Sequence, residues 1–312
     1  FFGFLIISLS FSFWYFIIGE IILGVGSSFI SGADSAILYD SLAESKKEDE
    51  YTKVEGVSYG IGNFSEAVAG ICGGLLAEIS LRLTWEVQVV VAGLIIPFTF
   101  LLVEPKVHQK NKLPKSFKAI WKVVRFCIVQ NKILKWLIII SSSIGLATLS
   151  LAWFAQPYFK SIDMPLKYFG FSWAILNLLT GISSINAYRL QRLLSKNRIL
   201  IFISLSISIS IFLLSKSTAI LGLILITTVY IVRGIATPVM RTYINELTPS
   251  NMRATVLSIR SFCIRVTFAV IAPLMGWIAD IYTLFQSFLF LSIIVGITSL
   301  LASLKLKALS NN

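Results

Sequence analysis

The chain has 312 residues, of which 56% are hydrophobic and 13% are charged, and its mean hydropathy is +0.84. Soluble domains carry about 25% charged residues, so this composition excludes an ordinary water-soluble fold. Apolar runs of roughly 20 residues recur along the chain, and each is long enough to cross about 30 Å of hydrocarbon. We therefore expect an all-α, polytopic membrane protein.

The net charge of +12 does not indicate a nucleic-acid partner, because the Lys and Arg residues gather in short segments between the apolar runs. Cys72, Cys127 and Cys263 lie far apart, and His108 is the single histidine. These counts give no support to a disulfide framework, a metal site or a histidine-based catalytic triad. We expect no metal and no cofactor, and the lack of a Walker motif argues against direct use of ATP.

Charges, prolines and polar clusters divide the chain into apolar spans. The predicted spans are a partial one at 1–11, then 14–42, 56–79, 86–103, 135–156, 168–188, 199–215, 218–244, 255–279 and 284–304. Of the 27 Lys and Arg residues, 19 fall in connections on one side, four on the other and four inside spans. This bias predicts a multi-pass protein of the cell membrane whose central loop and C-terminus are cytoplasmic.

The long connection between the fourth and fifth of these spans contains the segment "SFKAIWKVVRFCI", which begins at Ser116. Its apolar and basic residues alternate at helical spacing, which is typical of an amphipathic helix on an anionic membrane surface. A solvated linker helix is the alternative.

An internal repeat organises the whole chain. "GADSAILYD" begins at Gly32 and "GIATPVMRTY" at Gly234, and the downstream helix ends at Glu78 and Asp280 are separated by the same 202 residues. Two helix-pair units repeated in parallel predict two parallel six-helix halves. On this offset Phe1 corresponds to residue 203, so roughly 70 residues of the first half have no counterpart, and we expect its first two helices and most of the third to be missing.

Several segments carry a resemblance to a known family. They are "LGVGSSFISGADSAILYDSL", "AGICGGLLAE", "QPYF" and "RGIATPVMRTYINELTPSNMRATVLSIRSF" leading into "APLMGWIAD". Together they resemble the major facilitator superfamily, in a drug-transporter-like branch and with a truncated N-terminus. The resemblance implies an incomplete N-terminal half at 1–103, a cytoplasmic central loop with the amphipathic helix at 104–134, and a C-terminal half at 135–312. The helix-five segment lacks the proline of the family's antiporter motif, which weakens an assignment to export.

The function implied by this resemblance is secondary active transport of a small molecule by alternating access, proton-coupled and similar to drug efflux. Such a permease works as an antiporter or a symporter, is not an enzyme, and is a monomer in the lipid bilayer if complete. Two alternatives are an inactive truncated remnant of such a transporter and a polytopic membrane enzyme.

Ionisable side chains inside a span are costly unless they face a partner or a wet cavity, so they are candidate functional groups. Candidates for the substrate or proton pathway are Glu20, Asp34, Asn63, Glu66, Gln156, Arg233 and Arg265. Candidates for the cytoplasmic gate are Arg192, Arg253 and Arg260.

The positions of these residues along the predicted spans suggest a role for several of them. Glu20 and Asp34 belong to one stripe of small and polar residues at steps of three and four on the 14–42 span. Glu66 is the preferred proton-carrying carboxylate, because burial raises a carboxyl pKa towards a range where protons exchange; an ion pair with a nearby arginine is the alternative. Arg233 and Arg265 suit an anionic substrate group or a permanent carboxylate partner. Arg260 is expected to project from a different face than Arg265.

Other charges lie near the ends of spans, where long side chains reach water at little cost. Asp40 and Arg241 are of this kind, so a structural role is expected for both.

Overall fold

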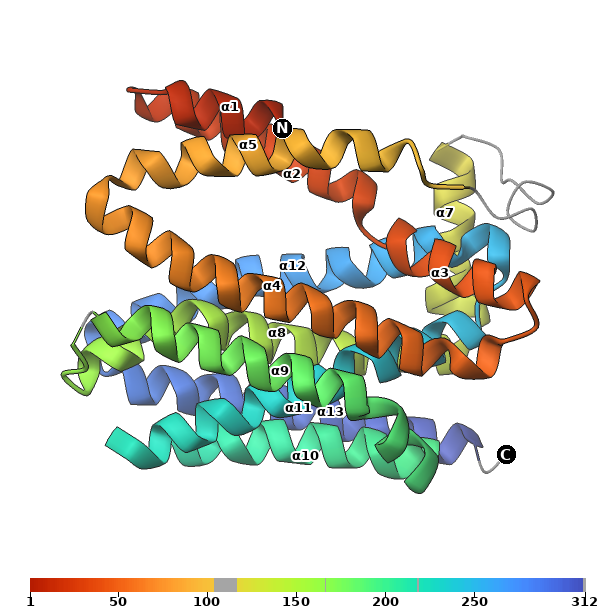
Figure 1. Ribbon diagram of the computed structural model, residues 1–312. Coiled ribbons are helices and arrows are strands. Elements are labelled where there is room, and N and C mark those ends of the chain that lie inside the picture. Colours follow the sequence, from red (N-terminus) through yellow and green to blue (C-terminus); the bar gives the residue numbers. More distant parts are fainter. Residues whose placement is uncertain (104–116, 166, 218, 311–312) are drawn as a thin grey trace.

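The computed structural model describes residues 1–103, 117–165, 167–217 and 219–310. Within these residues the chain is helical and has no strand, which confirms the all-α class (Figure 1). The helices are α1 (Phe2–Leu9), α2 (Phe13–Ile30), α3 (Ala33–Glu44), α4 (Tyr51–Ile79), α5 (Leu81–Thr99), α7 (Phe117–Arg125), α8 (Lys132–Ser161), α9 (Lys167–Leu193), α10 (Lys196–Leu214), α11 (Ala219–Glu246), α12 (Arg253–Ile281) and α13 (Leu284–Ser310). Short 3₁₀ turns at Glu48–Glu50 and Ser250–Met252 precede α4 and α12, and a π turn at Phe126–Gln130 follows α7.

Nine segments of the described chain are long and apolar enough to cross a membrane. Helices suit this environment because each backbone N–H and C=O group finds its partner within the same segment. Polar side chains mark where some of them begin: the Ser80 hydroxyl accepts a bond from the Arg82 amide at 3.2 Å, and the Asn131 side chain accepts one from Leu134 at 2.9 Å. Every predicted span is helical, although one of them, 14–42, is divided between two helices.

The span expected at 14–42 is wrong in one respect, because two helices replace the single continuous one. α2 ends at Ile30 and α3 begins at Ala33, with Gly32 between them at φ +80°. A β-carbon on Gly32 would lie 2.7 Å from the backbone oxygen of Ala254 in α12. The break thus lets the chain pass close to α12, in a left-handed conformation that glycine adopts without strain.

The break also overturns the expected polar stripe. Glu20 lies on α2, whereas Asp34 lies on the first turn of α3, so the two do not share the face of one helix. The Ser258 hydroxyl of α12 donates to the Ser31 carbonyl at 2.5 Å. A backbone carbonyl that is away from water needs a hydrogen-bond donor from the protein. The Ser258 hydroxyl provides this donor at the break.

The repeat of 202 residues is visible in the helix boundaries. α4 and α12 begin and end 202 residues apart, the two 3₁₀ turns before them are also offset by 202, and α3 and α11 end at Glu44 and Glu246. α11 is nevertheless continuous where its counterpart breaks. The two units therefore share their lengths and connections but differ at one bend.

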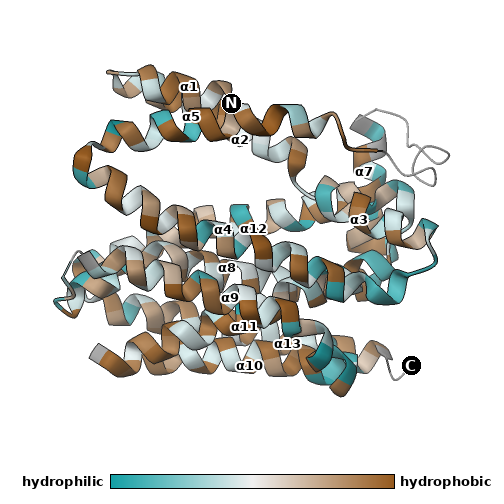
Figure 2. Ribbon diagram, viewed as in Figure 1, coloured by the Kyte–Doolittle hydropathy of each residue, from teal (hydrophilic) through white to brown (hydrophobic). Residues whose placement is uncertain are grey.

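Two groups of helices differ in packing. The buried hydrophobic cluster of the described chain is built mainly by α8–α13, which we call the C-terminal half, and α7 and the π turn add Val123 and Cys127 to it. α1 packs against α2 and α5 in a separate layer at the top of Figure 1. Figure 2 shows that this layer is predominantly hydrophobic, and large apolar side chains of α2 such as Phe29 are exposed. That exposure suits a lipid-facing surface.

α4 packs along α9 and is the main contact between the N-terminal helices and the C-terminal half. Glycines allow the two backbones to approach: a β-carbon on Gly56 would collide with the Ser184 carbonyl, and one on Gly60 would lie 3.1 Å from the Gly181 oxygen. We call the end of the bundle where Tyr51 begins α4 and where α7 lies the α7 end, and the opposite end the far end (Figure 1).

The predicted amphipathic helix is present as α7, while the polar residues of the loop up to 116 lie outside the described residues. Val123 and Cys127 are fully buried, and Ile120 and Trp121 are more than half exposed. One apolar side of this segment therefore anchors to the bundle, and the other remains open.

Candidate functional site

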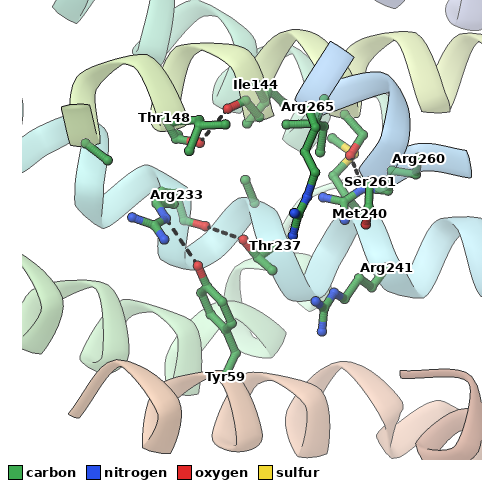
Figure 3. Close-up of a pocket in the computed structure, with 16 residues that line it drawn as sticks. Tyr59, Ile144, Thr148, Arg233, Thr237, Met240, Arg241, Arg260, Ser261 and Arg265 are labelled. Carbon is green, nitrogen blue, oxygen red and sulfur yellow. Dashed lines mark hydrogen bonds between the residues drawn. The ribbon is translucent and has the colours of Figure 1, made fainter. Parts of the chain in front are cut away.

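A cavity of about 540 Å³ lies between α4 and three helices of the C-terminal half (Figure 3). We call it the central cavity. Residues lining it are Tyr59 from α4, Ser141, Ile144, Gly145, Thr148, Leu149 and Ala152 from α8, Arg233, Ala236, Thr237, Met240 and Arg241 from α11, and Arg260, Ser261, Ile264 and Arg265 from α12. Its volume is that of a small-molecule site, for which 300–1,000 Å³ is the usual range.

Four arginines from α11 and α12 line this cavity. With about 1.5 Å of rise per residue, Arg233 lies about 20 Å from the Glu246 end of α11 and Arg265 about 18 Å from the start of α12. Both are thus near mid-helix. Arg241 and Arg260 lie closer to the α7 end.

Their contacts differ. Arg233 Nε donates to the Tyr59 hydroxyl at 3.2 Å, and Arg260 Nε donates to the Ser141 hydroxyl. Arg265 is exposed to the cavity. Among the described residues that line the cavity, none is acidic, so the wall carries a concentrated positive charge.

A second cavity of about 560 Å³ lies on the other side of Tyr59 and Arg241, which line both. It is bounded by α3 and α4 and receives the carboxyl groups of Asp34, Glu55 and Glu66. We call it the acidic cavity. The structure thus places negative groups in one cavity and positive groups in its neighbour.

Asn63 lines the acidic cavity while only 3% of its surface is exposed. Its side-chain amide donates to the Tyr59 carbonyl at 2.7 Å, but its oxygen has no hydrogen-bond partner within the described part of the chain. A buried acceptor without a donor is costly, which marks this position as a candidate ligand contact.

Gln156 does not line either cavity. It lines a third cavity of about 500 Å³ towards the far end, which shares Ala152 with the central cavity. Half of the residues that line this third cavity are aromatic: Trp153, Phe159, Phe169 and Trp173.

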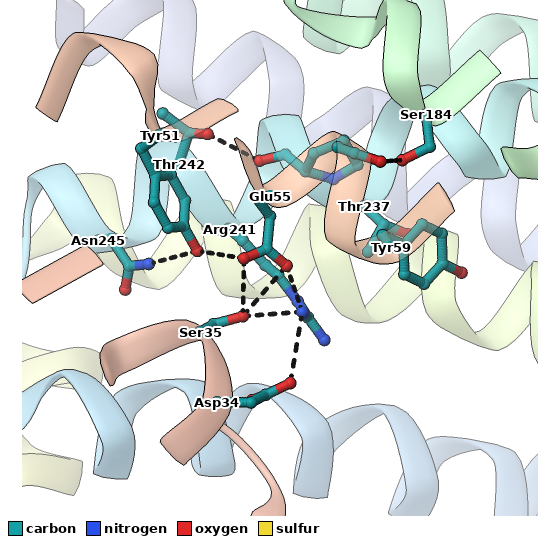
Figure 4. A network of polar contacts seen from close by, with 12 residues as sticks. Asp34, Ser35, Tyr51, Glu55, Tyr59, Ser184, Thr237, Arg241, Thr242 and Asn245 are labelled. Atoms are coloured by element: carbon teal, nitrogen blue, oxygen red, sulfur yellow. Dashed lines mark hydrogen bonds and ion pairs between the residues drawn. The ribbon is translucent and has the colours of Figure 1, made fainter. Parts of the chain in front are cut away.

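Glu55 forms the centre of a polar network that joins the two parts of the molecule (Figure 4). Its carboxylate pairs with Arg241 and accepts bonds from Ser35 at 3.2 Å and Tyr51 at 2.9 Å. Asn245 of α11 donates to the Tyr51 hydroxyl at 3.0 Å. The side chain of Glu55 is 3% exposed, so its charge depends on these partners.

A second ion pair lies nearer the α7 end. Arg253, the first residue of α12, pairs with Asp40 of α3, whose side chain is 1% exposed, and lies 4.1 Å from the Tyr39 ring centre. Thr52 and Thr242 share a hydrogen bond of 2.7 Å close by. Both carboxylates come from the N-terminal helices and both arginines from the C-terminal half.

The two ion pairs hold the N-terminal helices against the C-terminal half at the α7 end. Removing one partner of a buried pair costs about 3–5 kcal/mol, because the other charge is left uncompensated. Separating the helices would expose all of these groups to water instead. The network therefore holds the halves together only in the arrangement that pairs each charge, and we call it the α7 lock (Asp40–Arg253 and Glu55–Arg241).

The structure brings the sequence-predicted residues together in groups. Asp34, Asn63 and Glu66 share the acidic cavity, while Arg233, Arg260 and Arg265 share the central cavity. Glu20 lies exposed on α2, and Arg192 is exposed at the end of α9, where its guanidinium lies 5.6 Å from the Tyr188 ring centre.

Arg260 and Arg265 line the same cavity, which long side chains from different faces of α12 can both reach. Asp40 and Arg241 form ion pairs across the two halves. Both therefore have the structural role expected of them, but through a charged partner rather than through contact with water.

Tyr51, Glu55 and Tyr59 are site residues that the sequence analysis missed. They precede Asn63 on α4 at steps of four, so one helix face carries all four polar groups. The signal in the sequence is this spacing of four residues, which continues from Asn63 back to the start of the helix.

Comparisons with known proteins agree with this architecture. The family model described as Major Facilitator Superfamily matches residues 1–237. The crystal structure of a Major Facilitator Superfamily (MFS) transporter, FucP, in the outward conformation is similar with a TM-score of 0.72 and 12% identity, over 96% of this chain and 79% of that one. A search of curated proteins found no match. The family match covers well over half of the sequence, and the chain therefore belongs to the major facilitator superfamily, a family of membrane transporters of small molecules.

Proposed function

We propose that this protein is a secondary active transporter that works by alternating access, with the central cavity as its substrate site. One observation carries the proposal. The cavity lies between α4 of the N-terminal part and α8, α11 and α12 of the C-terminal half, at the interface whose relative movement would open it to one side and then to the other.

The α7 end is the cytoplasmic side in this proposal, as the distribution of Lys and Arg predicts. The α7 lock and the hydrogen bond from Ser184 to the Gly56 carbonyl at 2.8 Å join the halves at that end. In this proposal the described state is closed towards the cytoplasm, because these contacts hold the halves together at the α7 end. The ion pair with Asp40 supports Arg253 as a gate residue, and we add Arg241 to the gate because it pairs with Glu55.

Glu66 is the proposed proton carrier. It lines the acidic cavity, where it is exposed rather than buried as expected, and no ion pair joins it to an arginine within the described chain. Carboxylates at such positions inside a membrane protein form proton pathways, so a carboxylate that faces a cavity and has no fixed cationic partner suits this role. Proton antiport would drive export of the substrate, in keeping with the drug-efflux resemblance.

Transport and its coupling can be tested in inside-out vesicles that contain the full chain. Two dyes are tested separately: carboxyfluorescein, which is an anion, and ethidium, which is a cation. A pH gradient that is acidic inside the vesicles is expected to drive the accumulation of at least one of them. Glu66→Gln should abolish accumulation driven by the gradient and keep exchange of labelled for unlabelled dye. Glu78→Gln, on the same helix but exposed at the far end, is the matched control and should behave as wild type.

Full gradient-driven accumulation by Glu66→Gln would remove Glu66 from the coupling mechanism. Failure of the wild-type chain to move either dye, with or without a gradient, would count against the transport proposal itself.

A further inference from the structure

We propose that the central cavity binds a small amphipathic organic anion, whose acidic group is held by Arg233 and Arg265. The proposal rests on the proposed function, since it names the class of substrate for that same cavity. Its basis is the charge balance of the cavity wall.

Only one of the four cavity arginines has a carboxylate partner among the described residues. Arg241 pairs with Glu55 and lies 3.8 Å from Asp34. Arg233 and Arg260 bond to neutral hydroxyl groups, those of Tyr59 and Ser141. A hydroxyl accepts a hydrogen bond but does not cancel a charge, so two guanidinium groups remain uncompensated.

Arg265 adds a third such charge and presents it openly. It is exposed within the cavity, and in Figure 3 its side chain points from α12 into the space between the helices. Within the described residues its guanidinium has no ion-pair or hydrogen-bond partner. Since arginine keeps its charge in every accessible environment and offers paired N–H donors, these groups suit a carboxylate, sulfonate or phosphate oxygen.

The carboxylates that could have neutralised this wall lie elsewhere. Glu66 is in the acidic cavity, on the other side of Tyr59 and Arg241. An entering cation would meet like charges in the central cavity, whereas an anion would complete the charge balance.

The rest of the lining defines the other part of the ligand. Ile144, Leu149 and Ile264 contribute apolar surface to the same lining as the arginines. A cavity of about 540 Å³ that offers both positive charge and apolar surface matches a ligand with an acidic group on a hydrophobic body. Thr148 and Ser261 add neutral polar groups to this lining.

The test is binding to the purified full chain in detergent, measured as the shift in thermal unfolding temperature. Three probes of matched shape are naphthalene-2-sulfonate, the neutral naphthalene-2-sulfonamide and the cation 2-naphthylmethylammonium. We expect the sulfonate to stabilise the protein most and its effect to weaken as salt rises. Arg265→Gln and Arg233→Gln should each weaken sulfonate binding at least about tenfold, with partial recovery in Arg265→Lys.

Arg189→Gln is the matched control, because Arg189 is exposed on α9 and contacts its neighbour Tyr188; it should keep full sulfonate binding. Equal stabilisation by the three probes, no stabilisation by the sulfonate, or wild-type binding in both cavity variants would overturn the proposal. Binding is measured without a membrane, so anion binding by a chain that moves no dye would contradict the transport function alone, and transport without anion selectivity would contradict this inference alone.

Discussion

Arg241 is the residue at which the two cavities and the two parts of the molecule meet. It lines both cavities, pairs with Glu55 and donates to Ser35 at 2.7 Å. Its guanidinium thus separates the acidic from the basic cavity while it holds the α7 end closed. Substitutions of Arg241 should therefore affect the stability of the closed state more than they affect ligand binding.

We predict that Arg241→Gln destabilises the closed protein by about 3 kcal/mol, because the Glu55 carboxylate is left buried without its cation. The double variant Glu55→Gln/Arg241→Gln should be more stable than the sum of its two single variants predicts. Unfolding midpoints of the four proteins in one detergent measure this coupling. Additive effects would show that the pair contributes nothing to the α7 lock.

At the same scale, sequence reasoning was uneven for a physical reason. Arg233 and Arg265 stand in the middle of apolar spans, where a charge has no cheap explanation, and both line the central cavity. Arg241 and Asp40 sit near span ends, where snorkelling is the usual interpretation. Only the three-dimensional packing shows that a second helix covers those ends.

At the scale of elements, the bend between α2 and α3 determines how closely α12 approaches. Ser31 and Gly32 form it, and its backbone is supported by Ser258. Glycine at a positive φ angle inside a hydrophobic span was not anticipated, because apolar periodicity measures the length of a span and carries no information about its straightness.

Gly32→Ala should therefore destabilise the protein by about 1–2 kcal/mol for the left-handed backbone, with a further cost from the contact with Ala254. Gly24→Ala is the matched control on α2, since a β-carbon there meets nothing within 4 Å; it should be neutral or stabilising by up to about 1 kcal/mol. Thermal unfolding of the two variants decides, and an equally stable Gly32→Ala protein would show that the bend is not required.

The α4–α9 contact gives a second prediction at this scale. Gly56→Val inserts a side chain where the Ser184 carbonyl already lies, so it should force the two helices apart and lower the unfolding temperature. Gly73→Val, on the same helix and facing open space, should leave that temperature nearly unchanged. A similar loss in both variants would mean that valine itself, and not the lost approach, is responsible.

At the scale of the whole molecule, the lengths and positions of the apolar spans and the internal repeat could be predicted from the sequence with little error. The 202-residue offset recurs in the helix boundaries because the same helix-turn-helix unit is built twice. The pairing of α4 with α9 and the lock across the α7 end could not be predicted, since the hydrogen bonds between the halves join residues 128 to 227 positions apart. The pattern of residues within a single span carries no information about these contacts.

The central claim is that the halves rock about the central cavity while the α7 lock opens and closes. Spin-label distances test it most directly, without knowledge of the substrate, in a chain whose three cysteines are replaced. One pair of labels, at Lys47 and Asn251, spans the α7 end, and another, at the exposed Leu81 and Tyr282, spans the far end. Arg241→Gln/Arg253→Gln, which breaks both ion pairs, should lengthen the first distance and shorten the second. Distances that stay unchanged, or that lengthen at both ends together, would contradict alternating access.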